Sequence, residues 1–252
     1  MYRSPIGKKI LEFEQLASTN SKAKELIKEQ DICEGTVIKT KNQYSGRGYA
    51  FNTWESEAGK NVTASWILKP EFLSPQHQFR LTQMLSLAVK DTVDNYLPSD
   101  FVSSVKWPND IYVDNKKIAG ILVENSIMAD KIKTAVCGIG LNVNQEVFVS
   151  DAPNPVSMHQ ITGKTYDINE VIETLSAKIS YWYNCLRAEQ NELLLNAYHK
   201  ALFRMNTKAD FRTDEETFEG TIKGTDPWGR LIIETARGET RLFDFKEVVF
   251  VV

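Results

Sequence analysis

The sequence predicts an α+β protein, in which helices pack on a β-sheet and a small C-terminal β-barrel follows. Apolar residues recur at helical spacing through residues 78–97, while residues 61–68 alternate between apolar and polar side chains, as a half-buried strand does. After residue 206 the chain changes to short β runs separated by turns that contain glycine and proline. We therefore expect a first domain at residues 1–205 and a β-barrel domain at 206–252.

The elements of the first domain follow from caps and periodicity. A Ser-Thr-Asn cap and an Asp-x-x-Glu box each begin a helix. Helices are expected at residues 18–30, 78–97, 167–179 and 192–202. Strands are expected at residues 35–41, 61–68, 111–113, 117–125 and 134–144, with Gly138 and Gly140 opening the last strand into a polar loop.

The second domain is expected to be a barrel of about 45 residues, which is too small to be very stable alone. Its four β runs are residues 209–212, 218–223, 230–235 and 241–250. The turns between them read D-E-E, D-P-W-G and R-G-E, and such turns favour chain reversal.

Composition excludes several classes of protein. The net charge of −3 creates no basic field that would draw the chain to nucleic acid. No apolar run approaches the length that spans a membrane. The three cysteines lack C-x-x-C spacing and the three histidines are scattered, so neither a zinc site nor a Ser-His-Asp triad is supported. We expect a cytoplasmic protein that binds neither nucleic acid nor a membrane.

The stretch S-G-R-G-Y-A-F-N-T-W at 45–54 is a candidate ligand-binding loop. Gly46 and Gly48 free the backbone on both sides of Arg47, because glycine reaches positive φ at little steric cost. A guanidinium can form bidentate hydrogen bonds with a carboxylate or a phosphate, so this segment suits an anionic small molecule. The alternative is an ordinary glycine-rich loop, since G-x-G alone is a weak signal.

The stretch V-K-W-P-N-D-I-Y-V at 105–113 is the second candidate. Pro108 lacks an N–H and interrupts the strand ladder, which displays Lys106, Asn109 and Asp110 at a strand boundary. Lys117 begins the returning strand, so two lysines, a carboxylate and an amide are expected to converge across a tight hairpin. The alternative is that both lysines are solvated charges at a strand edge.

Taken in order, five motifs resemble the biotin protein ligases. They are S-T-N at 18–20, Q-x-x-G-R-G with a following Trp at 43–54, K-W-P-N-D at 106–110, K-x-A-G-I-L-x-E at 117–124 and G-x-G-x-N-V-N at 138–144. The resemblance implies a seven-stranded mixed sheet like that of class II aminoacyl-tRNA synthetases, and it accounts for the small C-terminal barrel. Because S-T-N begins at residue 18, we expect the short form of the family, without an N-terminal DNA-binding domain.

The resemblance also implies a reaction in two steps. Biotin and ATP give biotinyl-5′-AMP and pyrophosphate, and a lysine of a biotin carboxyl carrier protein or domain of a biotin-dependent carboxylase then takes the biotinyl group. ATP with Mg²⁺ and biotin are the expected ligands, the carrier is the expected partner, and a homodimer is a further expectation. No residue of this chain need be acylated.

The site residues carried over by this resemblance fall into three groups. The catalytic group is Arg47, Lys106, Asp110 and Lys117. The biotin-binding group is Ser18, Thr19, Asn20, Gln43, Arg47, Gly48, Tyr49, Lys117 and Gly120. The nucleotide-binding group is Trp54, Asn109 and Asn142, and no direct protein ligand of the metal is predicted.

Some roles stay open at this point. Ser18 to Asn20 could serve only as a helix cap, and Trp54 only as a hydrophobic anchor. Asp110 could position the incoming amine or orient Lys106 through a salt link. A lipoate or octanoate ligase or transferase resembles the same fold, and a biotin-sensing repressor is disfavoured by the acidic charge.

The chain departs from the family in its glycine-rich loop. The family pattern G-R-G-R-x-G-R-x-W is here G-R-G-Y-A-F-N-T-W, with Tyr49 and Asn52 in place of arginines and Phe51 in place of a glycine. The sequence therefore leaves open how tightly this loop closes over a bound intermediate.

Overall fold

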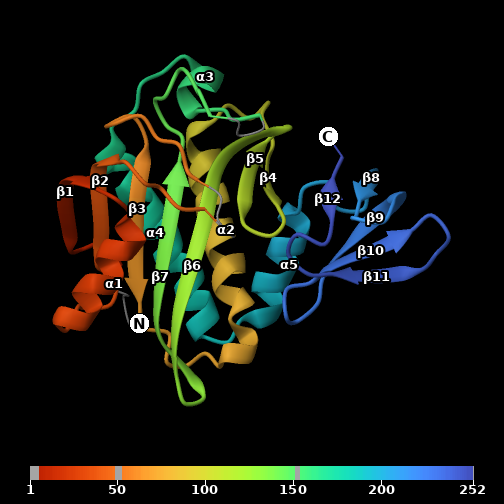
Figure 1. The fold of residues 1–252 in the computed structure, drawn as a ribbon, viewed down its shortest axis with the longest axis horizontal. Coiled ribbons are helices and arrows are strands. Elements are labelled where there is room, and N and C mark those ends of the chain that lie inside the picture. The colour runs from red at the N-terminus through yellow and green to blue at the C-terminus, as the bar shows by residue number, and fades with distance from the viewer. Residues whose placement is uncertain (1–5, 49–52, 151–153, 252) are drawn as a thin grey trace.

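The computed structural model describes residues 6–48, 53–150 and 154–251. A seven-stranded sheet with the order β1-β2-β3-β7-β6-β5-β4 forms the first part (Figure 1). Its strands are β1 (Ile10–Leu16), β2 (Val37–Gln43), β3 (Val62–Leu68), β4 (Ser103–Lys106), β5 (Asp110–Val113), β6 (Lys116–Met128) and β7 (Lys131–Leu141). β1 pairs with β2 in parallel and the other pairs are antiparallel, which confirms the predicted mixed sheet.

Helices cover both faces of this sheet. They are α1 (Thr19–Glu29), α2 (Phe79–Tyr96), α3 (Met158–Thr162), α4 (Ile168–Arg187) and α5 (Asn191–Ala201), with a short 3-10 turn η2 (Pro75–His77) before α2. α1 buries Ala23 and Leu26 against one face of the sheet, in a small cluster with Ile38 and Ile67. Because α1 is short, it covers only part of this face and leaves the rest open to a ligand.

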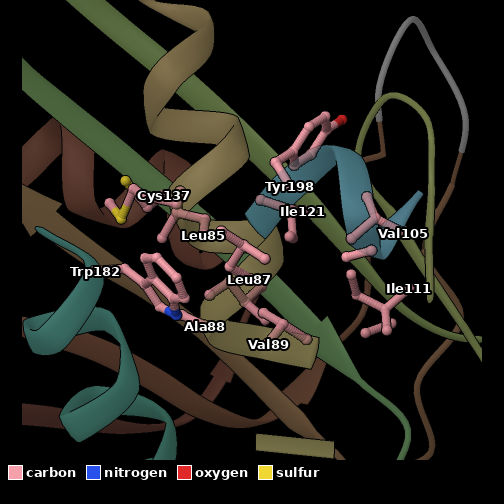
Figure 2. Close-up of a cluster of buried hydrophobic side chains, with 14 of the residues drawn as sticks. Leu85, Leu87, Ala88, Val89, Val105, Ile111, Ile121, Cys137, Trp182 and Tyr198 are labelled. Atoms are coloured by element: carbon pink, nitrogen blue, oxygen red, sulfur yellow. The ribbon is translucent and has the colours of Figure 1, made fainter. Parts of the chain in front are cut away.

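The opposite face carries the main core. Figure 2 shows Leu85 and Ala88 of α2 among side chains of the sheet, such as Ile121 and Cys137, with Trp182 of α4 beside them. All five side chains are buried, with at most 7% of their surface exposed. The helical stripe predicted in 78–97 is thus confirmed as the inward face of α2.

The C-terminal part is a five-stranded antiparallel sheet with the order β11-β10-β9-β8-β12. Its strands are β8 (Lys208–Arg212), β9 (Thr217–Thr225), β10 (Leu231–Thr235), β11 (Thr240–Phe243) and β12 (Val249–Phe250). The expected run 241–250 is divided between β11 and β12, and these two end strands do not pair with each other in the described residues. The small all-β unit is confirmed.

The two sheets share one continuous core. Trp107 stacks on Phe245 with ring centroids 5.1 Å apart, and its indole N–H donates to the carbonyl oxygen of Gly229 at 2.8 Å. Phe79 of α2 contacts both Tyr198 of α5 and Phe245. The division of the chain at residues 205 and 206 stays a prediction, because packing is continuous across it.

Three features differ from the sequence-based expectations. Residues 61–68 were expected to form a half-buried strand, but they form β3, which is buried along its whole length. β1 and β4, the two edge strands of the large sheet, were not predicted as separate strands, because β1 is largely exposed and β4 is only four residues long. Gly138 and Gly140 lie inside β7 and do not open it into a loop. Their lack of a Cβ serves close approach, as the site shows. In the described part of the chain, no helix is long and apolar enough to cross a membrane.

Candidate functional site

A cavity of about 220 Å³ lies on the face of the large sheet that α1 covers only in part. Eleven of the predicted site residues line it, namely Ser18, Thr19, Asn20, Gln43, Arg47, Gly48, Trp54, Asn109, Asp110, Lys117 and Gly120. Lys106 and Asn142 are not part of this lining, and Tyr49 lies outside the described residues. The structure thus brings together most of the residues that lie far apart in the sequence.

One end of the cavity is a hydrogen-bonded polar cluster at the start of α1. The backbone N–H of Thr19 donates to Gln43 Oε1 at 2.9 Å. Ser65 Oγ on β3 lies 2.7 Å from Thr19 Oγ1 and 2.6 Å from Asn20 Oδ1. Thr19, Asn20 and Ser65 are buried, so their hydroxyl and amide groups are fixed in direction.

Ser18 has the capping role that the sequence left open. It is the N-cap of α1, and its Oγ accepts from the Ser21 N–H at 3.4 Å. Because Ser18 also lines the cavity, the cap places the first turn of α1 toward a ligand. Its proposed contact with a ligand stays a prediction beside this structural role.

The floor of the cavity is flat because β6 and β7 carry glycines there. Gly120 lies opposite Gly140 in the register of the two strands. A Cβ on Gly140 would lie 2.2 Å from Cε2 of Trp54, and a Cβ on Gly120 would lie 3.1 Å from Cζ3 of the same ring. The indole of Trp54 therefore rests directly on the strand backbone, and its buried Nε1 has no hydrogen-bond partner among the described residues.

The other end of the cavity carries an ion pair. Lys117 Nζ lies 2.7 Å from Asp110 Oδ1, and it also sits 5.7 Å from the ring centroid of Trp54. Asn109 donates through Nδ2 to the carbonyl oxygen of Ile121, which fixes the turn between β4 and β5. This turn is part of the K-W-P-N-D motif, and it brings the Asp110 carboxylate and the Asn109 amide to the edge of the cavity where Lys117 of β6 supplies an ammonium group.

The glycine-rich loop is closed at its base by backbone contacts. The N–H of Trp54 donates to the Gly46 carbonyl oxygen at 3.0 Å, and Arg47 forms an antiparallel bridge with Thr53. A Cβ on Gly46 would lie 2.4 Å from the Trp54 carbonyl oxygen. Gly46 does not adopt a positive φ, contrary to the reason expected from sequence. It is required because the returning strand of the loop passes so close.

Lys106 points beside the cavity instead of into it. Its Nζ donates to the hydroxyl of Tyr112 at 3.1 Å and lies 5.4 Å from the ring centroid of Phe250 in the C-terminal sheet. Burial lowers the pKa of Lys106, although the nearby negative charge of Asp110 acts in the opposite direction. Burial also raises the pKa of Tyr112 to about 12. Asp110 forms an ion pair with Lys117, and the expected salt link from Asp110 to Lys106 is not present among the described residues.

Asn142 holds a loop together behind the cavity. Its Nδ2 donates to the Val156 carbonyl oxygen at 3.0 Å, and its backbone carbonyl accepts from the Met158 N–H. The buried Oδ1 of Asn142 has no hydrogen-bond partner among the described residues. Sequence reasoning placed this residue with the nucleotide, whereas the structure joins it to the segment before α3.

Sequence reasoning missed several residues of the site. Thr63 lines the cavity and Ser65 holds Thr19 and Asn20, and both lie on a strand whose alternation drew attention only to its apolar face. Phe245 and Lys246 reach the cavity from the C-terminal sheet, and no local pattern marked them. Glu124 ends the quoted K-x-A-G-I-L-x-E motif, so a signal was present, and it pairs with Arg47 and Lys24.

Comparison with known proteins places this site in a family. The model of the Biotin/lipoate A/B protein ligase family matches residues 12–142. The Bifunctional ligase/repressor BirA of Bacillus subtilis is 28% identical over 243 residues, which cover 94% of this chain and 73% of that protein. The Biotin--[acetyl-CoA-carboxylase] ligase of Paracoccus denitrificans is 26% identical over 228 residues, covering 88% and 94% respectively.

A solved structure agrees over nearly the whole chain. The biotin protein ligase of Aquifex aeolicus in complex with biotin and ATP superimposes with a TM-score of 0.79. The two sequences are 23% identical, and the alignment covers 97% of this chain and 99% of that chain. At this identity the likeness establishes the fold, including the C-terminal sheet.

Proposed function

The chain belongs to the Biotin/lipoate A/B protein ligase family, and from this we propose that it joins biotin to a carrier protein through biotinyl-5′-AMP. The relatives named above support biotin as the acyl substrate, and the Aquifex complex supports ATP. The proposed acceptor is a lysine of a biotin carboxyl carrier protein or domain, and the Paracoccus ligase supports a carboxylase as the partner, because its name gives acetyl-CoA-carboxylase for that enzyme.

The observation that carries the proposal is the polarity of the cavity along its length. Buried hydroxyl and amide groups of Thr19, Asn20 and Ser65 gather at one end. The ammonium of Lys117 and the amide of Asn109 lie at the other. The ureido ring of biotin needs both donors and acceptors, whereas its carboxylate and the α-phosphate of ATP need positive charge.

The chemical step brings two anions together. Carboxylate and α-phosphate repel each other, and cations placed between them lower that cost and stabilise the charge that develops at phosphorus. Lys117 is already in the cavity for this role, and Arg47 lines the cavity from the glycine-rich loop. Lys106 would join them after leaving Tyr112, so its catalytic role stays a prediction.

The residues of the cavity fit a magnesium ion that arrives with ATP. Mg²⁺ bound to a nucleotide takes one or two protein oxygens, together with phosphates and waters. The cavity offers the carboxylate of Asp110 and the side-chain carbonyl of Asn109. In the described residues, no group of three His, Cys, Asp or Glu side chains forms a separate metal site. The bound ion would neutralise the pyrophosphate leaving group.

The second step needs a neutral lysine from the carrier. The Asp110 carboxylate lines the cavity beside Lys117, so it is the group proposed to accept the proton of the incoming amine. Its ion pair with Lys117 also holds the ammonium in place. Neither residue need form a covalent bond to the substrate.

Incubation with labelled biotin, ATP, Mg²⁺ and a biotin carboxyl carrier domain tests the proposal directly. Label on the carrier lysine, dependent on ATP, is the expected result. A parallel reaction with labelled lipoate addresses the other branch of the family. Transfer of lipoate without transfer of biotin would replace the acyl substrate while leaving the family assignment intact.

A further inference from the structure

Glu124 of β6 has no role in the chemistry proposed above, yet three polar side chains converge on its carboxylate. Lys24 Nζ donates to Oε1 at 2.7 Å. Asn20 Nδ2 donates to Oε2 at 2.8 Å, and Arg47 Nη2 reaches the same oxygen at 3.3 Å. One carboxylate oxygen is therefore shared between a residue of the polar end of the cavity and the arginine of the glycine-rich loop.

The contact with Glu124, together with a longer one to the Leu122 carbonyl oxygen at 3.3 Å, determines which way the Asn20 amide points. A carboxylate accepts hydrogen bonds and cannot donate them, so the group that faces it must be the NH₂ of Asn20. The other end of the amide, Oδ1, then faces Ser65 Oγ at 2.6 Å. Asn20 is 3% exposed and lies against the backbone of Gly138, where a Cβ would come within 2.3 Å of Oδ1. The amide is thus clamped in one orientation.

The same carboxylate remains charged and holds Arg47 only weakly. Burial raises the pKa of Glu124, but hydrogen bonds from Lys24 and Asn20 and the nearby charge of Arg47 outweigh it, and the pKa lies below its ordinary value. The Arg47 side chain is 44% exposed and its contact is long, so this ion pair is easily exchanged. Lys24 stays at 2.7 Å and keeps the carboxylate paired when Arg47 leaves.

We propose that Glu124 is a positioning residue, which orients the Asn20 amide for the ureido ring of biotin and holds Arg47 at the cavity until an anionic ligand takes it. This inference rests on the proposed function of the cavity. Biotin binding then uses an amide whose direction is already set, and the guanidinium exchanges one carboxylate for the carboxylate or phosphate of the ligand.

Glu124→Gln is the direct test, because the glutamine amide can present either end to Asn20 and carries no charge for Arg47. Biotin-dependent exchange of pyrophosphate into ATP is measured with the full chain. We expect the KM for biotin to rise about tenfold while kcat changes less than about threefold, since one lost charge-assisted hydrogen bond corresponds to this order of effect. Glu124→Asp keeps the charge and is expected to restore part of the KM.

Two further variants make the result decisive. In an Asn20→Ala background, Glu124→Gln should raise the KM for biotin less than twofold, because the amide that it orients is absent. Glu14→Gln removes an exposed carboxylate paired with Lys41 far from the cavity and should leave both constants unchanged. Absence of exchange by the wild-type chain refutes the proposed function itself. Two outcomes overturn the role of Glu124 when the wild type shows exchange. One is an unchanged KM for biotin in Glu124→Gln, and the other is full additivity of the effects of Glu124→Gln and Asn20→Ala on that KM.

Discussion

Lys117 Nζ and Asp110 Oδ1 lie 2.7 Å apart across the pair of strands β5 and β6, and both residues line the cavity. The two residues are not partners in the strand register: Asp110 pairs with Gly120, and Lys117 pairs with Tyr112, with a register shift between Ile111 and Tyr112. The two side chains are 27% and 26% exposed, so the pair is partly desolvated and its loss should have a measurable effect on activity. We propose that the ammonium held in this way binds a phosphate oxygen of ATP.

Lys117→Ala should lower kcat/KM for adenylation by about 10- to 100-fold. A hydrogen bond to a charged group is worth about 1.5–3 kcal/mol, and about 1.4 kcal/mol corresponds to tenfold. Pyrophosphate exchange measures this step. Lys116→Ala is the matched control, because Lys116 is the exposed neighbour on the same strand and does not line the cavity. Equal losses in the two variants would remove Lys117 from the mechanism.

Asp110→Asn should impair transfer to the carrier more than adenylation. The amide leaves Lys117 in the cavity but cannot accept the proton of the incoming lysine. Single-turnover transfer from preformed biotinyl-5′-AMP is compared with pyrophosphate exchange, and transfer is expected to fall at least about tenfold further. If both steps fall equally, Asp110 acts only by holding Lys117.

Gly140→Ala should displace the Trp54 indole, whereas Gly120→Ala should do so less. The added Cβ would lie 2.2 Å from the ring in the first variant and 3.1 Å in the second. Real Cβ atoms do not approach to 2.2 Å, so the ring must move off the floor of the cavity. We expect a graded rise in the KM for ATP, accompanied by a graded change in tryptophan fluorescence that is absent in a Trp54→Phe background. Similar KM values in both variants would contradict a nucleotide contact through Trp54.

Much of this fold could be predicted because its long elements have a strong period. α2 and α4 display continuous apolar stripes. The position of β3 was predicted, but it is buried along its whole length and not half-buried as expected. β1 exposes charged residues and β4 is only four residues long, so local pattern does not separate these edge strands from loops. The C-terminal strands were found, but their packing onto Trp107 is a long-range contact that no local pattern encodes.

The site could be predicted where a motif is itself one structural unit. The turn K-W-P-N-D places Asn109 and Asp110 in the cavity as expected. Directions of side chains could not be predicted in the same way. Lys106 sits on the same turn but points to Tyr112 and Phe250, because β5 and the C-terminal sheet each offer it one aromatic face. Asn142 directly follows β7 but turns its amide to Val156.

His199 should make stability depend on pH through the contact between α5 and the C-terminal sheet. The Thr225 N–H donates to His199 Nε2 at 3.0 Å, so this nitrogen accepts and the ring is neutral. Burial lowers the pKa of His199 below its usual 6.5. The unfolded chain therefore binds the proton first, and stability that is complete above about pH 6.5 declines as the pH falls toward the folded pKa.

His199→Gln should flatten this decline. Urea unfolding at pH 7.5 and pH 5 gives the difference in unfolding free energy for each protein, and the difference should be smaller in the variant by up to about 1 kcal/mol. His77→Gln serves as the control, because His77 lies in the short turn before α2 and its Nδ1 contacts Ser74 Oγ of the same segment. A decline that is the same in all three proteins would assign the pH dependence to carboxylates.

Lys106→Met separates a catalytic role from a structural one. Methionine keeps much of the apolar packing against Tyr112 and Phe250 but removes the charge. If Lys106 leaves Tyr112 to reach the reacting anions, adenylation should fall at least about tenfold while the melting temperature changes little. Tyr112→Phe removes the hydrogen-bond acceptor of Lys106 and leaves the ring, so adenylation should stay within about twofold of wild type. A lowered melting temperature with intact adenylation in Lys106→Met would show that this lysine acts only by joining the β4–β5 turn to the C-terminal sheet.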